Sequence, residues 1–289
     1  MSPVRILLLA VTLATASQAS AQQVNPYEAV EFTVPRAAAG AALVVGRLRV
    51  PTGSPSPVPA VLIVNTTPGF DGRSESYAQD LNAAGLATLE VDFFQGRGAQ
   101  ASPRQHLPQV YESLRWLAAR PGIAADRVGV MGFSAGGAIA LLAASRPLAR
   151  GHAAGKARFA AHLALYPVCW RHHASATGGP GAWPGLRGAY REWTGRPVHI
   201  LSGGKDDYDG SQGCRPFLDA LPQAARRHVA HTLLPEATFA WDSRLGSAPY
   251  ESSAHQGRGG IVTVVANEHL ARQSRGFAVA YFLRHLRGP

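Results

Sequence analysis

The sequence predicts an α/β protein in which helices cover both faces of a mostly parallel sheet. Short apolar runs rich in Val, Ile and Leu alternate along the chain with segments of helical periodicity. The 289 residues are 46% hydrophobic, which is enough for one large core. The sequence contains no internal repeat and no linker before a second apolar unit, so we expect a single domain over residues 22–289.

The first 21 residues are expected to be a cleaved signal peptide. Arg5 supplies a positive charge, an apolar run follows it, and Ala19 to Ala21 provide the small residues of a cleavage site. The alternative is an anchor helix, but the run is shorter than the about 20 residues that span a bilayer. We therefore expect cleavage before Gln22, no membrane span in the mature chain, and export to the periplasm or beyond.

The predicted elements follow one another as strands with intervening helices. Strands are expected at residues 42–50, 60–65, 86–92, 127–133, 159–168, 197–204 and 228–237. Helices are expected at residues 74–84, 102–120, 135–146 and 266–286. Ser74 is the expected N-cap of the first helix and Gly85 its stop. In such sheets the reactive residues gather beyond the carboxyl ends of the strands.

Ser134 lies in a pattern that predicts a nucleophile. Gly132, Ser134 and Gly136 form G-x-S-x-G between an apolar strand and a helix. The two glycines allow the sharp turn that exposes the serine hydroxyl, and the N–H of Ala135 would face a developing oxyanion. The alternative is a glycine-rich turn that serves packing alone.

A serine nucleophile needs a second oxyanion donor and an acid. Pro68 has no N–H, so the loop after residues 60–65 offers Thr67 as the expected donor and Thr66 as the second choice. Asp206 follows the strand at 197–204 and is the expected acid, with Asp207 as the alternative. The competing interpretations are an ordinary loop at Thr66 and Thr67 and a solvated acidic turn at Asp206 and Asp207.

Charge and cysteine content limit the kinds of partner, cross-link and bound group that we expect. The formal net charge is +10, but the arginines are scattered singly, so we expect a solvated basic surface and no nucleic-acid partner. Cys169 and Cys214 are an even pair, which suggests one disulfide in an exported chain. No second Cys or His pair has ligand spacing, so we expect neither a metal nor a cofactor.

These motifs together resemble the exported branch of the dienelactone hydrolase family, in the α/β-hydrolase superfamily. The resemblance rests on the stretches PAVLIVNTTPGFDGRSESYAQDLNAAGLATLEVDFFQGRG, RVGVMGFSAGG, LALYPVCW, SGGKDDYDGSQGC, LPEATFAWD and GFAVAYFLRHL. It implies the α/β-hydrolase fold and hydrolysis of small carboxylic esters or lactones through an acyl-serine. Relatives often carry cysteines at both places, so the resemblance also implies a disulfide between Cys169 and Cys214.

Three positions depart from the pattern of this family. The elbow carries Ser134 where well-known members have cysteine, and Asn65-Thr66 replaces His-Gly after an early strand. Phe239 stands where relatives have the general-base histidine. Phenylalanine cannot accept a proton, so the resemblance also allows a catalytically impaired protein that keeps the pocket and binds a small ligand.

Other histidines are candidates for a substitute base. His255 lies downstream in a loop, and His172 and His173 follow the strand at 159–168. The alternative is that all three are loop or surface histidines. Residues 170–195 are a candidate lid whose aromatic side chains either wall the site or pack on the body; these are Trp170, Trp183, Tyr190 and Trp193.

Overall fold

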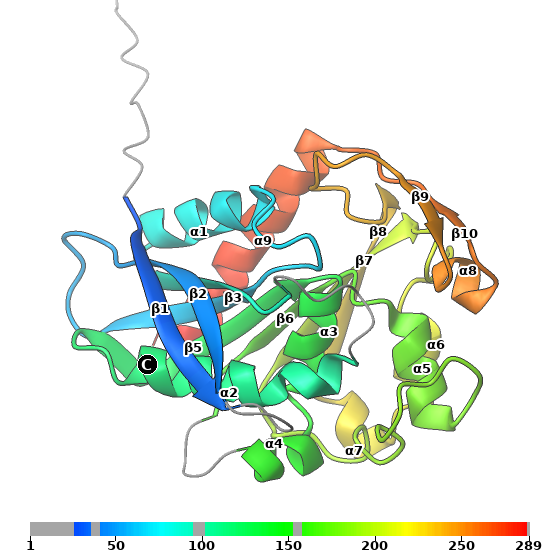
Figure 1. Ribbon diagram of the computed structural model, residues 1–289, viewed down its shortest axis with the longest axis horizontal. Helices are drawn as coiled ribbons and strands as arrows, with labels where there is room; N and C mark the ends of the chain where they lie inside the picture. The colour runs from blue at the N-terminus through cyan, green and yellow to red at the C-terminus, as the bar shows by residue number, and fades with distance from the viewer. Residues whose placement is uncertain (1–25, 36–40, 95–101, 153–157, 288–289) are drawn as a thin grey trace, which may run out of the picture.

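A computed structural model of the chain describes residues 26–35, 41–94, 102–152 and 158–287 (Figure 1). The expected signal peptide, residues 1–21, lies outside these ranges. The main sheet has eight strands in the order β1-β2-β4-β3-β5-β6-β7-β8. The strands are β1 (Glu28–Pro35), β2 (Ala41–Arg49), β3 (Val58–Val64), β4 (Ala87–Asp92), β5 (Ile123–Phe133), β6 (His162–Leu165), β7 (Val198–Lys205) and β8 (Val229–Thr238). β1, β2 and β4 pair antiparallel, and all pairs from β4 through β3 to β8 are parallel.

Helices cover both faces of this sheet (Figure 1). The described helices are α1 (Arg73–Ala83), η1 (Pro103–His106), α2 (Leu107–Ala118), α3 (Ala135–Leu142), α4 (Arg146–His152), α5 (Cys169–Thr177), α6 (Arg215–Ala220), α7 (Gln223–Arg226), α8 (Ala254–Gly257) and α9 (Glu268–Leu286). A separate two-stranded hairpin consists of β9 (Ala248–Glu251) and β10 (Gly260–Val262). No helix among the described residues is long and apolar enough to cross a bilayer.

The alternation of side chains along the central strands creates two cores. Leu62 and Val64 of β3 pack in the core that includes residues of α2 and α3. Val61 and Ile63 point the other way, into the core that includes residues of α1 and α9. Because both faces of β3 are buried, its sequence is continuously apolar. The predicted α/β class with helices on both faces is therefore confirmed.

Several local expectations need correction. α1 begins at Arg73 after Gly72, whose φ is 89°, and no side chain caps it; Ser74 is buried inside the first turn and is not the N-cap. Gly85 ends this helix as expected, in the left-handed region at φ 85°. Among the elements that no sequence pattern predicted are β1, α5 and the β9–β10 hairpin. β1 is an edge strand, and the other two belong to segments dominated by Gly, Pro and polar residues.

Candidate active site

Ser134 occupies the sharp turn between β5 and α3. Its backbone has φ 52° and ψ −115°, a conformation that is strained for a residue with a side chain. Its N–H donates to the carbonyl oxygen of Leu165, and its own carbonyl oxygen accepts from the N–H of Ala138. These bonds to β6 and to α3 hold the turn in place. Such a turn is the geometry that a nucleophile elbow requires.

The glycines two residues before and after Ser134 have no room for a side chain. A Cβ on Gly136 would lie 2.2 Å from the carbonyl oxygen of Val64, and one on Gly132 would lie 2.3 Å from the carbonyl oxygen of Gly136. Real side chains do not approach a backbone oxygen this closely. The close approach of α3 to β3 therefore needs glycine at position 136, and the tight turn from β5 into α3 needs glycine at position 132, as the motif predicts.

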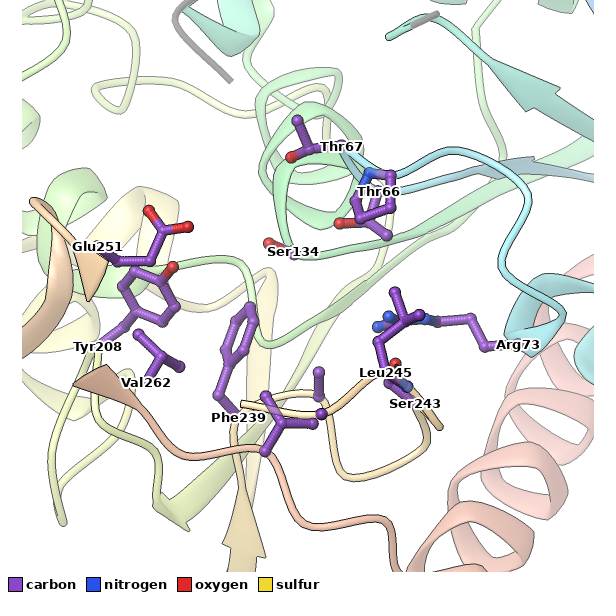
Figure 2. A pocket seen from close by; sticks show the side chains of 14 residues that line it. Thr66, Thr67, Arg73, Ser134, Tyr208, Phe239, Ser243, Leu245, Glu251 and Val262 are labelled. Atoms are coloured by element: carbon purple, nitrogen blue, oxygen red, sulfur yellow. Dashed lines mark hydrogen bonds between the residues drawn. The ribbon is translucent and has the colours of Figure 1, made fainter. Parts of the chain in front are cut away.

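Ser134 opens into a pocket of about 420 Å³ at the carboxyl ends of the strands (Figure 2). Thr66, Thr67 and Pro68 of the loop after β3 form one part of its wall, close to the serine. The residues that complete the lining are Arg73, Tyr208, Phe239, Ala240, Ser243, Leu245, Gly246, Glu251, Val262 and Val264. The pocket is thus mostly apolar, with a few polar groups near the serine, as small-molecule sites commonly are.

The expected oxyanion donors lie on either side of the serine. Ala135 is the first residue of α3, where backbone N–H groups have no partner within the helix. Thr66 and Thr67 line the pocket, and a turn in which the Gly69 N–H donates to the Thr66 carbonyl oxygen shapes their loop. Asn65, which replaces histidine, is buried and donates from Nδ2 to the carbonyl oxygen of Val91 at 3.2 Å. Asn65 therefore anchors the start of the loop to β4 on its buried side.

Asp206 lies directly after β7 and is buried, with 1% of its surface exposed. Its Oδ1 accepts from the backbone N–H of Tyr208 at 2.7 Å. Its Oδ2 is buried and has no hydrogen-bond partner among the described residues. Burial, and next the negative charge of Asp209, raise the pKa of Asp206 well above its usual value. Burial therefore favours the neutral, protonated form of Asp206, whose Oδ2 has no donor among the described residues.

The other two carboxylates of this turn have partners. Oδ2 of Asp207 accepts from the backbone N–H of Thr263 at 2.7 Å and so ties the turn to the end of the hairpin. Asp209 accepts from the N–H groups of Cys169 and Trp170 at the start of α5, at 2.9 and 2.7 Å. Burial raises the pKa of Asp209 to about 6. Asp206 is the member of the turn with a buried carboxylate oxygen that has no hydrogen-bond partner among the described residues.

Phe239 presents an apolar ring to the pocket where the resemblance predicts the base (Figure 2). It follows β8, and its ring contacts Tyr208 and Tyr166 edge-on, with centroids 4.6 and 5.2 Å away. Lys205 and Thr238 are partners in the register of β7 and β8. Asp206 and Phe239, the next residue of each strand, therefore leave the sheet side by side.

The candidate substitute bases lie elsewhere. No histidine is among the described residues that line the Ser134 pocket. His255 is in α8, where its N–H donates to the carbonyl oxygen of Asp207 and its ring packs near Gly260. His172 is buried with Nδ1 2.7 Å from the Tyr190 hydroxyl, and burial lowers its pKa to about 3. Nδ1 of His173 donates to the carbonyl oxygen of Pro216 at 3.0 Å.

The candidate lid at 170–195 does not border the pocket. Trp183, Tyr190 and Trp193 are buried in the core on the α2–α3 side of the sheet. The pocket wall opposite Ser134 comes from residues 243–264, which include the hairpin. Within this segment the sequence suggested only His255, as a candidate base in a loop, because strands of four and three residues give no alternating periodicity.

Arg73 is a pocket residue that sequence reasoning also missed. It is buried, and its guanidinium donates to both carboxylate oxygens of Asp71 and to the Tyr166 hydroxyl at 2.9 Å. Asp242 lies 3.8 Å from it and accepts from the hydroxyls of Tyr166 and Tyr77 at 2.5 and 2.8 Å. Burial raises the pKa of Asp242, although Arg73 opposes the shift. Two carboxylates therefore compensate the charge of Arg73.

A disulfide joins Cys169 at the start of α5 to Cys214 just before α6, as predicted. The two cysteines and Asp209 lie close enough together to hold a metal ion geometrically. Their chemistry does not fit one, because the sulfurs are bonded to each other and both Asp209 oxygens accept backbone N–H groups.

Known proteins support the same fold. A family profile for the α/β hydrolase fold matches residues 100–194. A candidate dienelactone hydrolase from Klebsiella pneumoniae is 19% identical, with a TM-score of 0.62 over 90% of this chain and 100% of that one. The carboxylesterase Cest-2923 from Lactobacillus plantarum is 17% identical, with a TM-score of 0.62 over 91% of this chain and 100% of that one.

Esterase 2 of Thermogutta terrifontis, solved after phosphorylation by paraoxon, is 13% identical. Its TM-score is 0.62, and the match covers 90% of this chain and 96% of the esterase. No curated protein matches the sequence. At these identities the likeness establishes the fold, and it agrees with the resemblance drawn from the motifs.

Proposed function

Because this chain has the α/β-hydrolase fold and its motifs resemble those of the dienelactone hydrolases, we propose that it hydrolyses small carboxylic esters or lactones through an acyl-serine. The observation that carries the proposal is the strained turn at Ser134, which opens into a pocket of about 420 Å³. A pocket of this size suits a small substrate. Phe239, Leu245 and Val262 favour an uncharged acyl group beside the serine.

In the proposed reaction the Ser134 oxygen bonds to the carbonyl carbon and the ester oxygen leaves as an alcohol. The N–H groups of Ala135 and Thr67 stabilise the oxyanion of each tetrahedral intermediate. Water then releases the carboxylic acid and restores the serine hydroxyl. With no imidazole in the described pocket wall, the hydroxyl proton passes to water. A positioned base commonly contributes about 10²–10⁴-fold, so we expect slow turnover and a preference for good leaving groups.

Hydrolysis of p-nitrophenyl acetate and butyrate by the mature protein and by Ser134→Ala tests this proposal. We expect the variant to lose the activity and the parent to give an acyl adduct on Ser134 that mass spectrometry detects after a rapid acid quench. Equal rates for the two proteins, together with no adduct, would exclude the acyl-serine route.

A second candidate function is ligand binding without turnover. It is favoured by Phe239, which gives the pocket an apolar wall where a base is expected, and by the unpaired Oδ2 of Asp206. Calorimetry with slowly hydrolysed amide analogues of small esters tests it. Saturable binding that survives Ser134→Ala, with equal esterase rates in both proteins, is the expected result. Turnover that depends on Ser134 would contradict this candidate.

We also propose that the chain is exported and that residues 22–289 form one domain. The signal-like N-terminus and the disulfide support export, since disulfides persist in oxidising compartments. N-terminal sequencing of protein recovered outside the cytoplasm should begin at Gln22. Recovery of only the uncleaved chain from the membrane fraction would contradict the proposal.

A further inference from the structure

A second cavity, of about 650 Å³, lies at the opposite end of the sheet from Ser134. It is bordered by the segments that enter β7 and β8 and by the last turns of α9; Val198 and Val229, the first residues of the two strands, are in its wall. Ser134 follows the far end of β5, which runs parallel to them. Figure 1 shows α7, which leads into the cavity, across the sheet from the β9–β10 hairpin that walls the Ser134 pocket. The cavity is therefore separate from the proposed active site.

Apart from Tyr281, every ionisable residue that lines this second cavity is an arginine or a histidine. The group consists of Arg227, Arg284, His199, His228 and His285. No Asp or Glu lines the cavity, and none occurs in the parts of the sequence outside the described ranges. The cavity wall therefore contains no negative side chain to balance its positive charge.

The two arginines of the cavity have exposed side chains without an ion-pair partner among the described residues. Other surface arginines differ: Arg215 and Arg226 both pair with Asp219, and Arg272 pairs with Glu268. Arg227 donates from Nε to His228, which leaves its terminal nitrogens available. A planar guanidinium with free N–H groups is suited to bind a carboxylate or phosphate through two parallel hydrogen bonds.

Burial and neighbouring basic groups lower the pKa of two of the imidazoles in this cavity. Burial, and next the charge of Arg284, lower the pKa of His285. Burial lowers the pKa of His199 to about 4, and nearby His231 and His285 add to the shift. His199 is also held in place, with Nε2 2.9 Å from the hydroxyl of Thr232. The shifts disfavour the charged forms of His199 and His285, so the arginines supply positive charge in this cavity.

One wall of the cavity is aromatic. Phe277, Tyr281 and His285 recur every four residues and so share one face of α9. The Phe277 and Tyr281 rings are nearly parallel, with centroids 6.1 Å apart, and the His199 ring lies 4.5 Å from Phe277. The Tyr281 hydroxyl donates a hydrogen bond shared between the carbonyl oxygens of His162 and Pro197, which holds the ring in place. A flat apolar group can pack against this wall.

We propose that this cavity binds a small aromatic carboxylate. The carboxylate would interact with the guanidinium groups of Arg227 and Arg284, and the ring would lie against Phe277 and Tyr281. The two requirements come from different observations, since unpaired arginines select for negative charge and the aromatic wall selects for a planar ring. The site does not depend on the function proposed for Ser134.

Isothermal titration with benzoate at low ionic strength tests the proposal, with benzamide as the uncharged analogue and acetate as the anion without a ring. We expect saturable benzoate binding that is at least about tenfold tighter than that of either analogue. Arg284→Gln should weaken it about tenfold, the usual size of a lost charge-assisted hydrogen bond. Arg272→Gln, on the same helix but outside the cavity, should leave binding unchanged. Ser134→Ala should also bind benzoate normally, which separates this site from the catalytic pocket.

Three titration results would overturn the proposal, and an NMR measurement adds a fourth. One is benzoate affinity that is unchanged in the Arg227→Gln, Arg284→Gln double variant. The second is equal binding of benzamide and benzoate, and the third is equal binding of acetate and benzoate. Phe277→Leu provides a variant without a charge change, and we expect it to weaken benzoate but not acetate. The imidazole NMR signals of His199 and His285 should shift during the benzoate titration, and no shift would contradict binding at this cavity.

Discussion

Phe239→His should convert the Ser134 pocket into one with a complete catalytic set. Phe239 follows Thr238, which is the register partner of Lys205, so the new imidazole would leave the sheet beside Asp206. Oδ2 of Asp206 is buried without a described donor, and an imidazole N–H at position 239 would supply one. Phe239 already faces the pocket that Ser134 lines, so the other ring nitrogen would point toward the serine.

The expected gain in rate is the contribution of a general base, since no histidine is among the described residues that line the pocket of the parent protein. A positioned general base is worth about 10²–10⁴-fold, which corresponds to about 3–5 kcal/mol of activation free energy. The imidazole is smaller than the phenyl ring, so it fits the space between Tyr208 and Tyr166 without displacing either. Ionisation of the buried Asp206 opposes the gain, because burial raises its pKa, and a neighbouring imidazolium offsets part of that cost. We therefore expect an increase in kcat/KM of at least about 10²-fold.

The assay is hydrolysis of p-nitrophenyl butyrate between pH 6 and pH 9, about the range over which an imidazole base becomes neutral. Phe239→Leu is the matched control, since it removes the ring without adding a base. Adding Asp206→Asn to Phe239→His should remove most of the gain, and adding Ser134→Ala should remove all of it. A rate for Phe239→His equal to that of Phe239→Leu, or a gain that persists without Ser134, would refute the reasoning.

Three further predictions concern stability, and urea unfolding measures each. Reduction of the Cys169–Cys214 disulfide, which closes a 45-residue separation, should lower the free energy of unfolding by about 3–4 kcal/mol, and Cys214→Ser should show no further loss on reduction. Burial lowers the pKa of His162 to about 4, below the unfolded value, so stability should be full above pH 6.5 and fall as pH drops toward 4. His162→Asn should remove about 3 kcal/mol of that pH dependence, and an unchanged acid slope would contradict it. Arg73→Met should cost about 3–5 kcal/mol by leaving buried carboxylates unpaired, whereas exposed Arg272→Met should cost little.

The features that were predicted correctly are those that a local pattern determines. β3 is apolar throughout because both of its faces are covered, so a short run identifies it. Gly132 and Gly136 are recognisable because a side chain at either would overlap backbone atoms. The cysteine pairing followed from there being only two cysteines in the chain. In each case the physical constraint acts on the residue itself or on its immediate neighbours.

The features that were missed depend on contacts between distant segments. Residues 243–264 wall the pocket, yet their short strands give little periodicity, and the hairpin is placed through contacts such as that between Thr263 and Asp207. Trp183, Tyr190 and Trp193 were compatible with a lid, but they are buried in the core. Trp170 is half-buried and packs against the cluster that contains Tyr208 and Val262. Arg73 and Asp242 are 169 residues apart, and no local pattern indicates that they meet near Ser134.

The same distinction explains how the turn at Ser134 can keep its geometry with no histidine among the described residues that line the pocket. The turn at Ser134 is maintained by glycines, by the bond to Leu165 and by the packing of α3 on β3, and none of these involves position 239. Phe239 in turn gains packing against two tyrosines, so a phenylalanine there is compatible with a stable pocket. Fold and elbow geometry are therefore independent of an imidazole at position 239 in this protein. A rate measured with and without an imidazole at position 239 reports on chemistry alone, provided that the two proteins unfold at the same urea concentration.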